Sequence, residues 1–84
     1  MTPDEIKTLI ATGIDCTEIR VDGDGSHFSA IVVSAVFEGL NMVKQHQLVY
    51  GTLGGRMGGD IHALSIQAYT PSQWETASKL QVLS

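Results

Sequence analysis

The chain has 84 residues, of which 43% are hydrophobic and 17% are charged. A domain of this size buries only about 60% of the surface that its unfolded chain exposes, so we expect a single domain with one modest core. Five basic against nine acidic side chains give a formal net charge of −4. This charge repels polyanions and argues against nucleic acid as the main partner.

No apolar stretch reaches the ~18 residues that a membrane-spanning helix needs. Asp4 and Glu5 stand where a signal peptide would carry basic residues, so we expect a cytoplasmic protein that does not bind membranes. The only cysteine, Cys16, cannot form an internal disulfide and cannot by itself supply a thiolate metal site. Any metal held by this chain must therefore use histidines or ligands from a partner.

Two Thr-Pro pairs predict the starts of helices. Thr2 is a suitable N-cap, and Glu5 three residues later completes a capping box. Apolar residues then recur at helical spacing up to Gly13, where this first helix is predicted to end. Thr70 and the proline after it repeat the pattern, so we expect a last helix that carries Trp74.

A β-hairpin is predicted to follow the first helix. Residues 16–21 alternate between two faces, with polar side chains on one of them, as a half-buried strand does. Residues 22–26 are rich in Asp and Gly and favour a turn. The next strand, residues 28–33, is apolar on both faces and is therefore expected in the middle of the sheet.

The second half of the chain predicts a helical crossover and a third strand. Residues 37–53 have helical periodicity, either as one helix or as a short helix that turns into a longer one at Gly39. Glycines within residues 54–59 end the helix, and residues 61–69 alternate as a strand. The order is α-β-β-α-(α)-β-α, an α/β (α+β) fold with a three-stranded mixed sheet and helices packed on it.

Two histidines are predicted to open neighbouring strands. The crossover is long enough to make the second and third strands parallel neighbours. His27 opens the second strand and His62 the third, so both lie at the same end of the sheet, roughly 5 Å apart across the strands. The residue pattern alone fits a metal-ligand pair, and it fits two hydrogen-bonded histidines at strand ends as well.

Three segments resemble the BolA family. They are Phe-Glu-Gly-Leu at residues 37–40, Lys-Gln-His-Gln-Leu-Val-Tyr at residues 44–50 and Ile-His-Ala-Leu-Ser-Ile at residues 61–66. The likeness extends over nearly all of the chain, which as a whole is similar to the short bacterial branch of the family often called IbaG. A Phe-Gly pair, a histidine before Val-Tyr and a second histidine opening the last strand form a specific combination.

The resemblance implies a fold similar to the class II KH domain and the role of a non-enzymatic adaptor. It also implies a complex with a monothiol glutaredoxin, in which the two proteins and glutathione share a [2Fe–2S] cluster. In such complexes the BolA partner contributes the histidine that opens the last strand, here His62. A second ligand comes from the loop before the second strand, here His27. The isolated chain is expected to hold no cofactor, and the resemblance leaves open whether the cluster-free chain forms a homodimer.

The third histidine departs from the family pattern. His46 lies between Gln45 and Gln47, whereas arginines usually flank the family's central histidine, and only Lys44 is basic nearby. This departure weakens the DNA-binding interpretation that is sometimes attached to the family. The helical spacing of His46 with Met42 predicts a partly buried side chain that fixes helix packing, with contact to an Fe–S partner or to nucleic acid as the alternative.

A KH-like nucleic-acid-binding transcriptional regulator is the alternative function. Gly-x-x-Gly spacing, with which KH loops clamp a nucleic-acid backbone, occurs at residues 51–54 and 55–58. These glycines are predicted to follow the long helix, whereas a KH loop joins two helices. Lys44 and Arg56 are the only cations near this surface. Cys16 has no neighbouring base or orienting group, so we assign no catalytic residue and expect no enzymatic activity.

Overall fold

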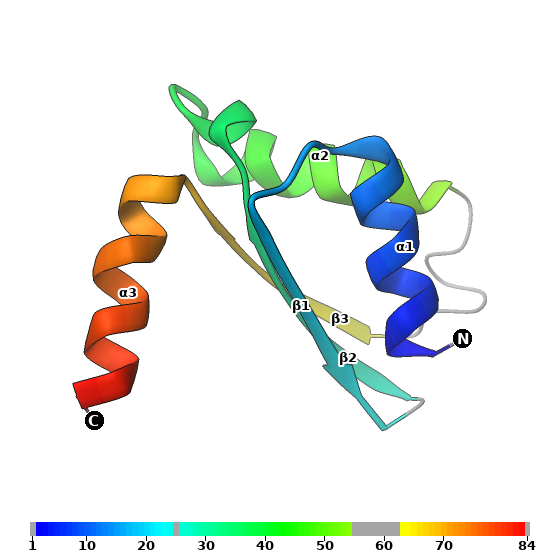
Figure 1. Cartoon of the computed structure of the whole chain (residues 1–84). Coiled ribbons are helices and arrows are strands. Elements are labelled where there is room, and N and C mark those ends of the chain that lie inside the picture. Colours follow the sequence, from blue (N-terminus) through cyan, green and yellow to red (C-terminus); the bar gives the residue numbers. More distant parts are fainter. Residues whose placement is uncertain (1, 25, 55–62, 84) are drawn as a thin grey trace.

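A computed structural model describes residues 2–24, 26–54 and 63–83 of the chain. Figure 1 shows its elements in chain order: α1 (Pro3–Gly13), β1 (Glu18–Gly23), β2 (His27–Val33), the 3₁₀ helix η1 (Ala35–Phe37), α2 (Met42–Leu53), β3 (Ala63–Tyr69) and α3 (Pro71–Leu83). This order and the mixed α+β class confirm the fold expected from the sequence. Within the described ranges, no helix is both long enough and apolar enough to cross a membrane.

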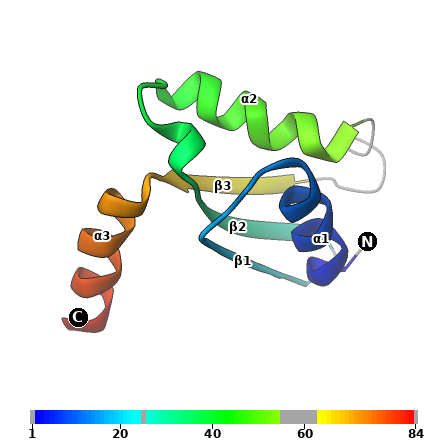
Figure 2. The same ribbon diagram turned by 45° about the horizontal axis from the view of Figure 1, so that its top comes forward.

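The strands form one mixed sheet in the order β1-β2-β3, which can be followed in Figure 2. β1 and β2 pair as the antiparallel hairpin expected from the turn residues, and Gly23 lies opposite Phe28. β2 and β3 are parallel, from His27 opposite Ala63 to Val33 opposite Tyr69. The predicted crossover is therefore confirmed, and the apolar strand β2 is the central one.

Two strand boundaries differ from the expectation. β1 begins at Glu18, two residues later than predicted, and continues through Gly23 because pairing with β2 reaches that far into the predicted turn. The expected start of the third strand, including His62, lies outside the described residues, and the described strand begins at Ala63.

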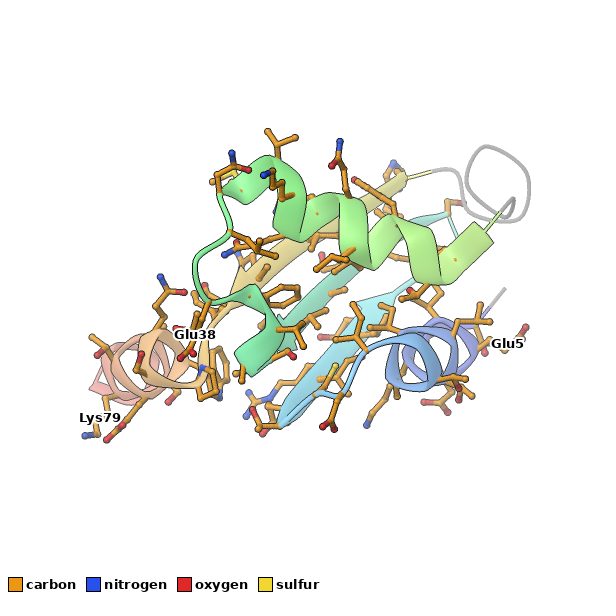
Figure 3. The ribbon with its side chains drawn as sticks, turned by 90° about the horizontal axis from the view of Figure 1, so that it is seen from above. Glu5, Glu38 and Lys79 are labelled. Atoms are coloured by element: carbon orange, nitrogen blue, oxygen red, sulfur yellow. The ribbon has the colours of Figure 1, made fainter. Side chains whose placement is uncertain are left out.

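α1 and α2 lie on the same face of the sheet, whereas α3 extends away from the strands at the end where β3 finishes (Figures 1 and 3). Glu5 on α1 and Lys79 on α3 mark opposite ends of the molecule in Figure 3. The apolar core lies between the two helices and the sheet. Its fully or almost fully buried side chains are Ile6, Ile10, Ile14, Phe28, Ala30, Val32, Phe37, Val49 and Leu53.

The predicted caps form at both Thr-Pro pairs. The Thr2 side-chain oxygen accepts a hydrogen bond from the Glu5 N–H at 3.2 Å. At the start of α3 the exchange is reciprocal: the Gln73 N–H donates to Thr70 Oγ1 at 3.3 Å, and the Thr70 N–H donates to Gln73 Oε1 at 2.9 Å. Each cap satisfies backbone donors that the first helical turn leaves unpaired.

The crossover between β2 and β3 consists of a short helix followed by a longer one, which is the second of the two arrangements that the sequence allowed. Gly39 has φ +79°, a left-handed conformation that favours glycine, and it separates η1 from α2. α2 then restarts at the N-cap Asn41, whose side chain accepts the Lys44 N–H at 2.9 Å. Gln45 ties the two parts together, because its side-chain amide donates to the carbonyl oxygens of Phe37 and Leu40 at 3.2 and 3.1 Å.

Candidate functional site

His27 stands at the first position of β2, where the hairpin turn fixes its backbone. Asp24 Oδ1 accepts hydrogen bonds from the N–H groups of Ser26 at 3.0 Å and of His27 at 2.9 Å. The Asp24 N–H donates in return to the His27 carbonyl oxygen at 3.2 Å. The His27 residue is exposed, so this turn presents its imidazole to solvent at one end of the sheet.

The same turn changes the acidity of Asp24. The N–H of His27, followed by that of Ser26, holds the pKa of the Asp24 carboxyl below its ordinary value, because both donors favour the ionised form. The folded state therefore gains stability from this carboxylate above the unfolded-state pKa of about 3.9, and loses it as the pH falls through the lowered folded-state pKa.

We predict that Asp24→Asn reduces this pH dependence. Wild type and variant should differ most in urea midpoint near neutral pH, and the difference should shrink in acid as the wild-type carboxyl becomes protonated. Urea unfolding at a series of pH values measures the difference. The neighbouring Asp22→Asn is the control, since the exposed Asp22 side chain accepts no hydrogen bond from the described residues. Equal pH dependence in wild type and Asp24→Asn would contradict this role for the carboxylate.

The second candidate ligand, His62, lies outside the described residues, and so does Arg56. The residue that follows His62 in the chain, Ala63, is the register partner of His27 in the parallel pair. The prediction that the second and third strands begin side by side is therefore confirmed for His27 and Ala63. Ligation by either histidine stays a prediction.

One imidazole at a strand end cannot hold a metal alone. Within residues 2–24, 26–54 and 63–83, no three His, Cys, Asp or Glu side chains lie close enough to bind one ion together. His27 is exposed, and its ring makes no hydrogen bond within these ranges, so the ring nitrogens are accessible to a metal ion. The residues of these four types therefore do not form a metal site among themselves in these ranges.

His46 is half-buried on α2, as its spacing predicts. Together with Met42 and Gln45 it lines one side of a groove of about 250 Å³, and residues 66–69 of β3 line the other. Because residues 66–69 lie three to six positions beyond Ala63, the partner of His27, the groove is centred about 15 Å along the strand from the His27 end. The structure therefore does not bring His46 and His27 together.

The sequence analysis did not anticipate this groove. Its floor consists of ordinary strand and helix residues, and only the side-by-side arrangement of α2 and β3 makes it. The sequence offered one signal, the spacing of Met42 with the core residues Val49 and Leu53, but this spacing predicts burial. Only the structure shows that Met42 is 69% exposed and lines the groove.

Basic side chains do not gather into a patch within the described residues. Lys44 is exposed and is the only cation on α2. Arg20 lies over the Trp74 ring, 5.2 Å from its centroid, and pairs with Glu18 at 3.7 Å. Lys79 pairs with Glu75 at 3.3 Å, on α3. This distribution offers little phosphate neutralisation along α2.

The glycine motif at residues 51–54 is not a loop. Residues 51–53 form the last turn of α2, and Gly54 ends the helix with φ +59°. This corrects the expectation that the motif follows the helix: the helical backbone persists through Gly51 because Val49 and Leu53, on either side, are both buried in the core. The second motif, residues 55–58, lies outside the described residues.

Cys16 behaves as the small apolar residue that the sequence predicts. It is half-buried beside the core, and its Sγ donates to the Ile14 carbonyl oxygen at 3.3 Å. Burial, followed by the negative charge of Asp15, raises the pKa of the thiol. A thiol held in its protonated form is a poor nucleophile, which argues against cysteine catalysis.

Comparison with known proteins places the chain in a family. A model of the family described as BolA-like protein matches residues 12–73. The acid stress protein IbaG of Escherichia coli strain K12 is 42% identical over 81 residues, which cover 95% of this chain and 96% of that protein. The chain belongs to the BolA family. The expected resemblance, including the likeness to IbaG, is therefore confirmed.

Other BolA proteins extend the comparison. Human BolA-like protein 1 is 48% identical over 58 residues, which cover 69% of this chain and 42% of that longer protein. The structure of a BolA homologue from Coxiella burnetii has a TM-score of 0.76 at 46% identity and covers 89% of this chain and 97% of that one. The solution structure of mouse BolA1 has a TM-score of 0.79 at 29% identity, with coverage of 90% and 70%. The fold described above is thus the BolA fold.

Proposed function

We propose that this BolA-family chain is a non-enzymatic adaptor in iron–sulfur cluster assembly or trafficking. It would bind a monothiol glutaredoxin and share with it a glutathione-ligated [2Fe–2S] cluster. His62 and His27 would be the ligands on this chain's side, and thiolates of the glutaredoxin and glutathione would hold the other side.

One observation carries the proposal. The parallel register sets His27 opposite Ala63, the residue directly after His62 in the chain, so two potential imidazole ligands belong to adjacent strand starts. Family membership supports the choice of partner.

The ligand chemistry gives the adaptor a distinct effect on the cluster. Imidazoles in place of thiolates on one iron remove negative charge from the cluster, and such substitution raises the reduction potential. Only a neutral ring nitrogen binds iron, so acid should favour release. In such a complex the two irons would have different ligands, whereas a pair of glutaredoxins gives both irons the same ligands. The mixed complex would therefore be suited to releasing its cluster to another protein.

Nucleic-acid binding has weaker support. Lys44 is a single cation on α2, and the net charge of −4 opposes association with a polyanion. A mobility-shift assay over a salt series separates the two functions. Tight, salt-sensitive binding that Lys44→Glu removes would favour the regulator over the adaptor.

The proposal is tested by anaerobic reconstitution with a monothiol glutaredoxin, glutathione, iron and sulfide. We expect a mixed complex in size-exclusion chromatography, with visible absorption and circular dichroism that differ from those of the glutaredoxin alone. The same mixture without glutathione is the control. Separate elution of the two proteins, together with an unchanged glutaredoxin spectrum, would overturn the proposal.

A further inference from the structure

The groove between α2 and β3 contains two side chains of types that bind soft metal ions. Met42 and His46 both line its α2 wall. They are separated by the spacing i, i+4 on α2, which places two side chains next to each other on one helix face, with about 5–6 Å between their Cβ atoms. Two histidines at this spacing bind one zinc ion in helical metalloprotease motifs. Here a thioether sulfur takes the place of one imidazole.

Neither side chain is committed to another polar group. The His46 ring is half-buried and makes no hydrogen bond within the described residues. Met42 lies outside the core in spite of its apolar spacing, with most of its side chain exposed. The sulfur of Met42 and the ring of His46 are therefore available to a ligand that enters the groove.

Both walls of the groove are held in place by contacts of their own. The side chain of Asn41 caps the first turn of α2, and the Gln45 amide ties this turn to the preceding crossover. On the facing wall, Tyr69 packs against Trp74 with the ring centroids 5.4 Å apart. A wall that is already ordered lowers the entropic cost of binding.

The residue types in the groove select the class of metal. Thioethers favour Cu(I), and imidazole also binds copper. Zinc uses Cys, His, Asp and Glu, and of these types only His46 is among the described lining residues. Calcium and magnesium prefer carboxylate oxygens, and no described lining residue carries one. The partial positive charge at the start of α2 opposes any cation, so affinity must come from the soft sulfur ligand.

We propose that Met42 and His46 form a binding site for a soft monovalent cation, with Cu(I) as the natural ion and Ag(I) as its stable substitute. Solvent or a small thiol completes the coordination. The site is separate from the cluster proposed at His27, because the groove is centred about 15 Å along the strand from that end of the sheet. The inference therefore does not rest on the proposed function.

The test is a titration with Ag(I), and with Cu(I) under anaerobic conditions, of protein that carries ¹³C-methyl methionine and ¹⁵N-histidine. It is done in a Cys16→Ala background, because the Cys16 thiol is itself a soft ligand. The Met42 methyl resonance and the His46 ring resonances should shift together and saturate at a one-to-one ratio. Met42→Leu and His46→Gln should each raise the dissociation constant at least about tenfold, as measured by competition with a chelator.

The matched control moves the thioether along the same helix. Leu48 is 42% exposed and lies two residues from His46, a spacing at which side chains do not face each other. The double variant Met42→Leu/Leu48→Met should therefore bind Ag(I) no more tightly than Met42→Leu alone. Zn(II) should leave the Met42 methyl resonance in place, and far-UV circular dichroism should show that all variants are folded.

Two results would overturn the inference. One is a Met42 methyl resonance that neither Ag(I) nor Cu(I) shifts. The other is a shift of equal size and equal affinity in His46→Gln, because it would show that the thioether binds the ion without the imidazole.

Discussion

Alanine in place of His62 is expected to remove the mixed cluster. After reconstitution with glutaredoxin and glutathione, the signal of the mixed complex should be at least about tenfold weaker than in wild type. Removing a residue that only hydrogen-bonds to a metal ligand lowers metal affinity by about that factor, and removing the ligand itself should cost at least as much. The remaining signal should be that of the glutaredoxin with glutathione alone. Visible circular dichroism of the purified complex, normalised to iron content, measures the effect.

The other two histidines provide matched comparisons for this result. His46→Ala should leave the spectrum unchanged, because His46 lines the groove centred toward the opposite end of the sheet. His27→Ala should keep a cluster that is altered and more readily lost, as expected for a weaker, exchangeable ligand. An unchanged spectrum in His62→Ala, or an equal loss in His46→Ala, would contradict the ligand assignment.

Phe37→Ala is expected to cost about 3–5 kcal/mol of folding free energy, as for other buried phenylalanines. Phe37 is fully buried and belongs to η1, which lies between β2 and α2. Its carbonyl oxygen accepts hydrogen bonds from the Leu40 N–H at 3.2 Å and from Gln45 at 3.2 Å, so the turn around it is fixed and cannot readily collapse into the cavity. Urea unfolding followed by the fluorescence of Trp74 measures the loss.

A loss this large approaches the stability of a small domain, about 5–15 kcal/mol in total, so a fraction of the variant should be unfolded even without urea. Val36→Ala is the matched control in the same 3₁₀ helix. Val36 is 47% exposed, and its truncation should change stability by no more than about 0.5 kcal/mol. Similar losses in both variants would show that η1 is not anchored by the Phe37 ring.

The sequence was sufficient for most of the fold because its signals are local. The Thr2 and Thr70 caps, the Asp-Gly turn and the left-handed Gly39 each specify a chain reversal or a helix start with neighbouring residues alone. The parallel pairing of β2 and β3 followed from one topological rule applied to a long crossover. The β1 boundary was missed because strand ends depend on how far pairing continues, which is a property of both strands.

The candidate site was predictable only in part. His27 could be assigned to a strand start from its distance to the turn, and the parallel rule made Ala63 its neighbour. The groove beside His46 and the stacking of Arg20 on Trp74 join residues that are distant in sequence, so no local pattern indicated them.

The most direct measurement asks whether this chain's imidazoles bind the cluster. The chain would be labelled with ¹⁵N-histidine, reconstituted with unlabelled glutaredoxin and glutathione, and studied by pulsed electron paramagnetic resonance after one-electron reduction of the cluster. We predict ¹⁵N hyperfine couplings of directly bound imidazole, which disappear in His62→Ala. A mixed complex whose reduced cluster shows no ¹⁵N coupling from this chain would contradict the account.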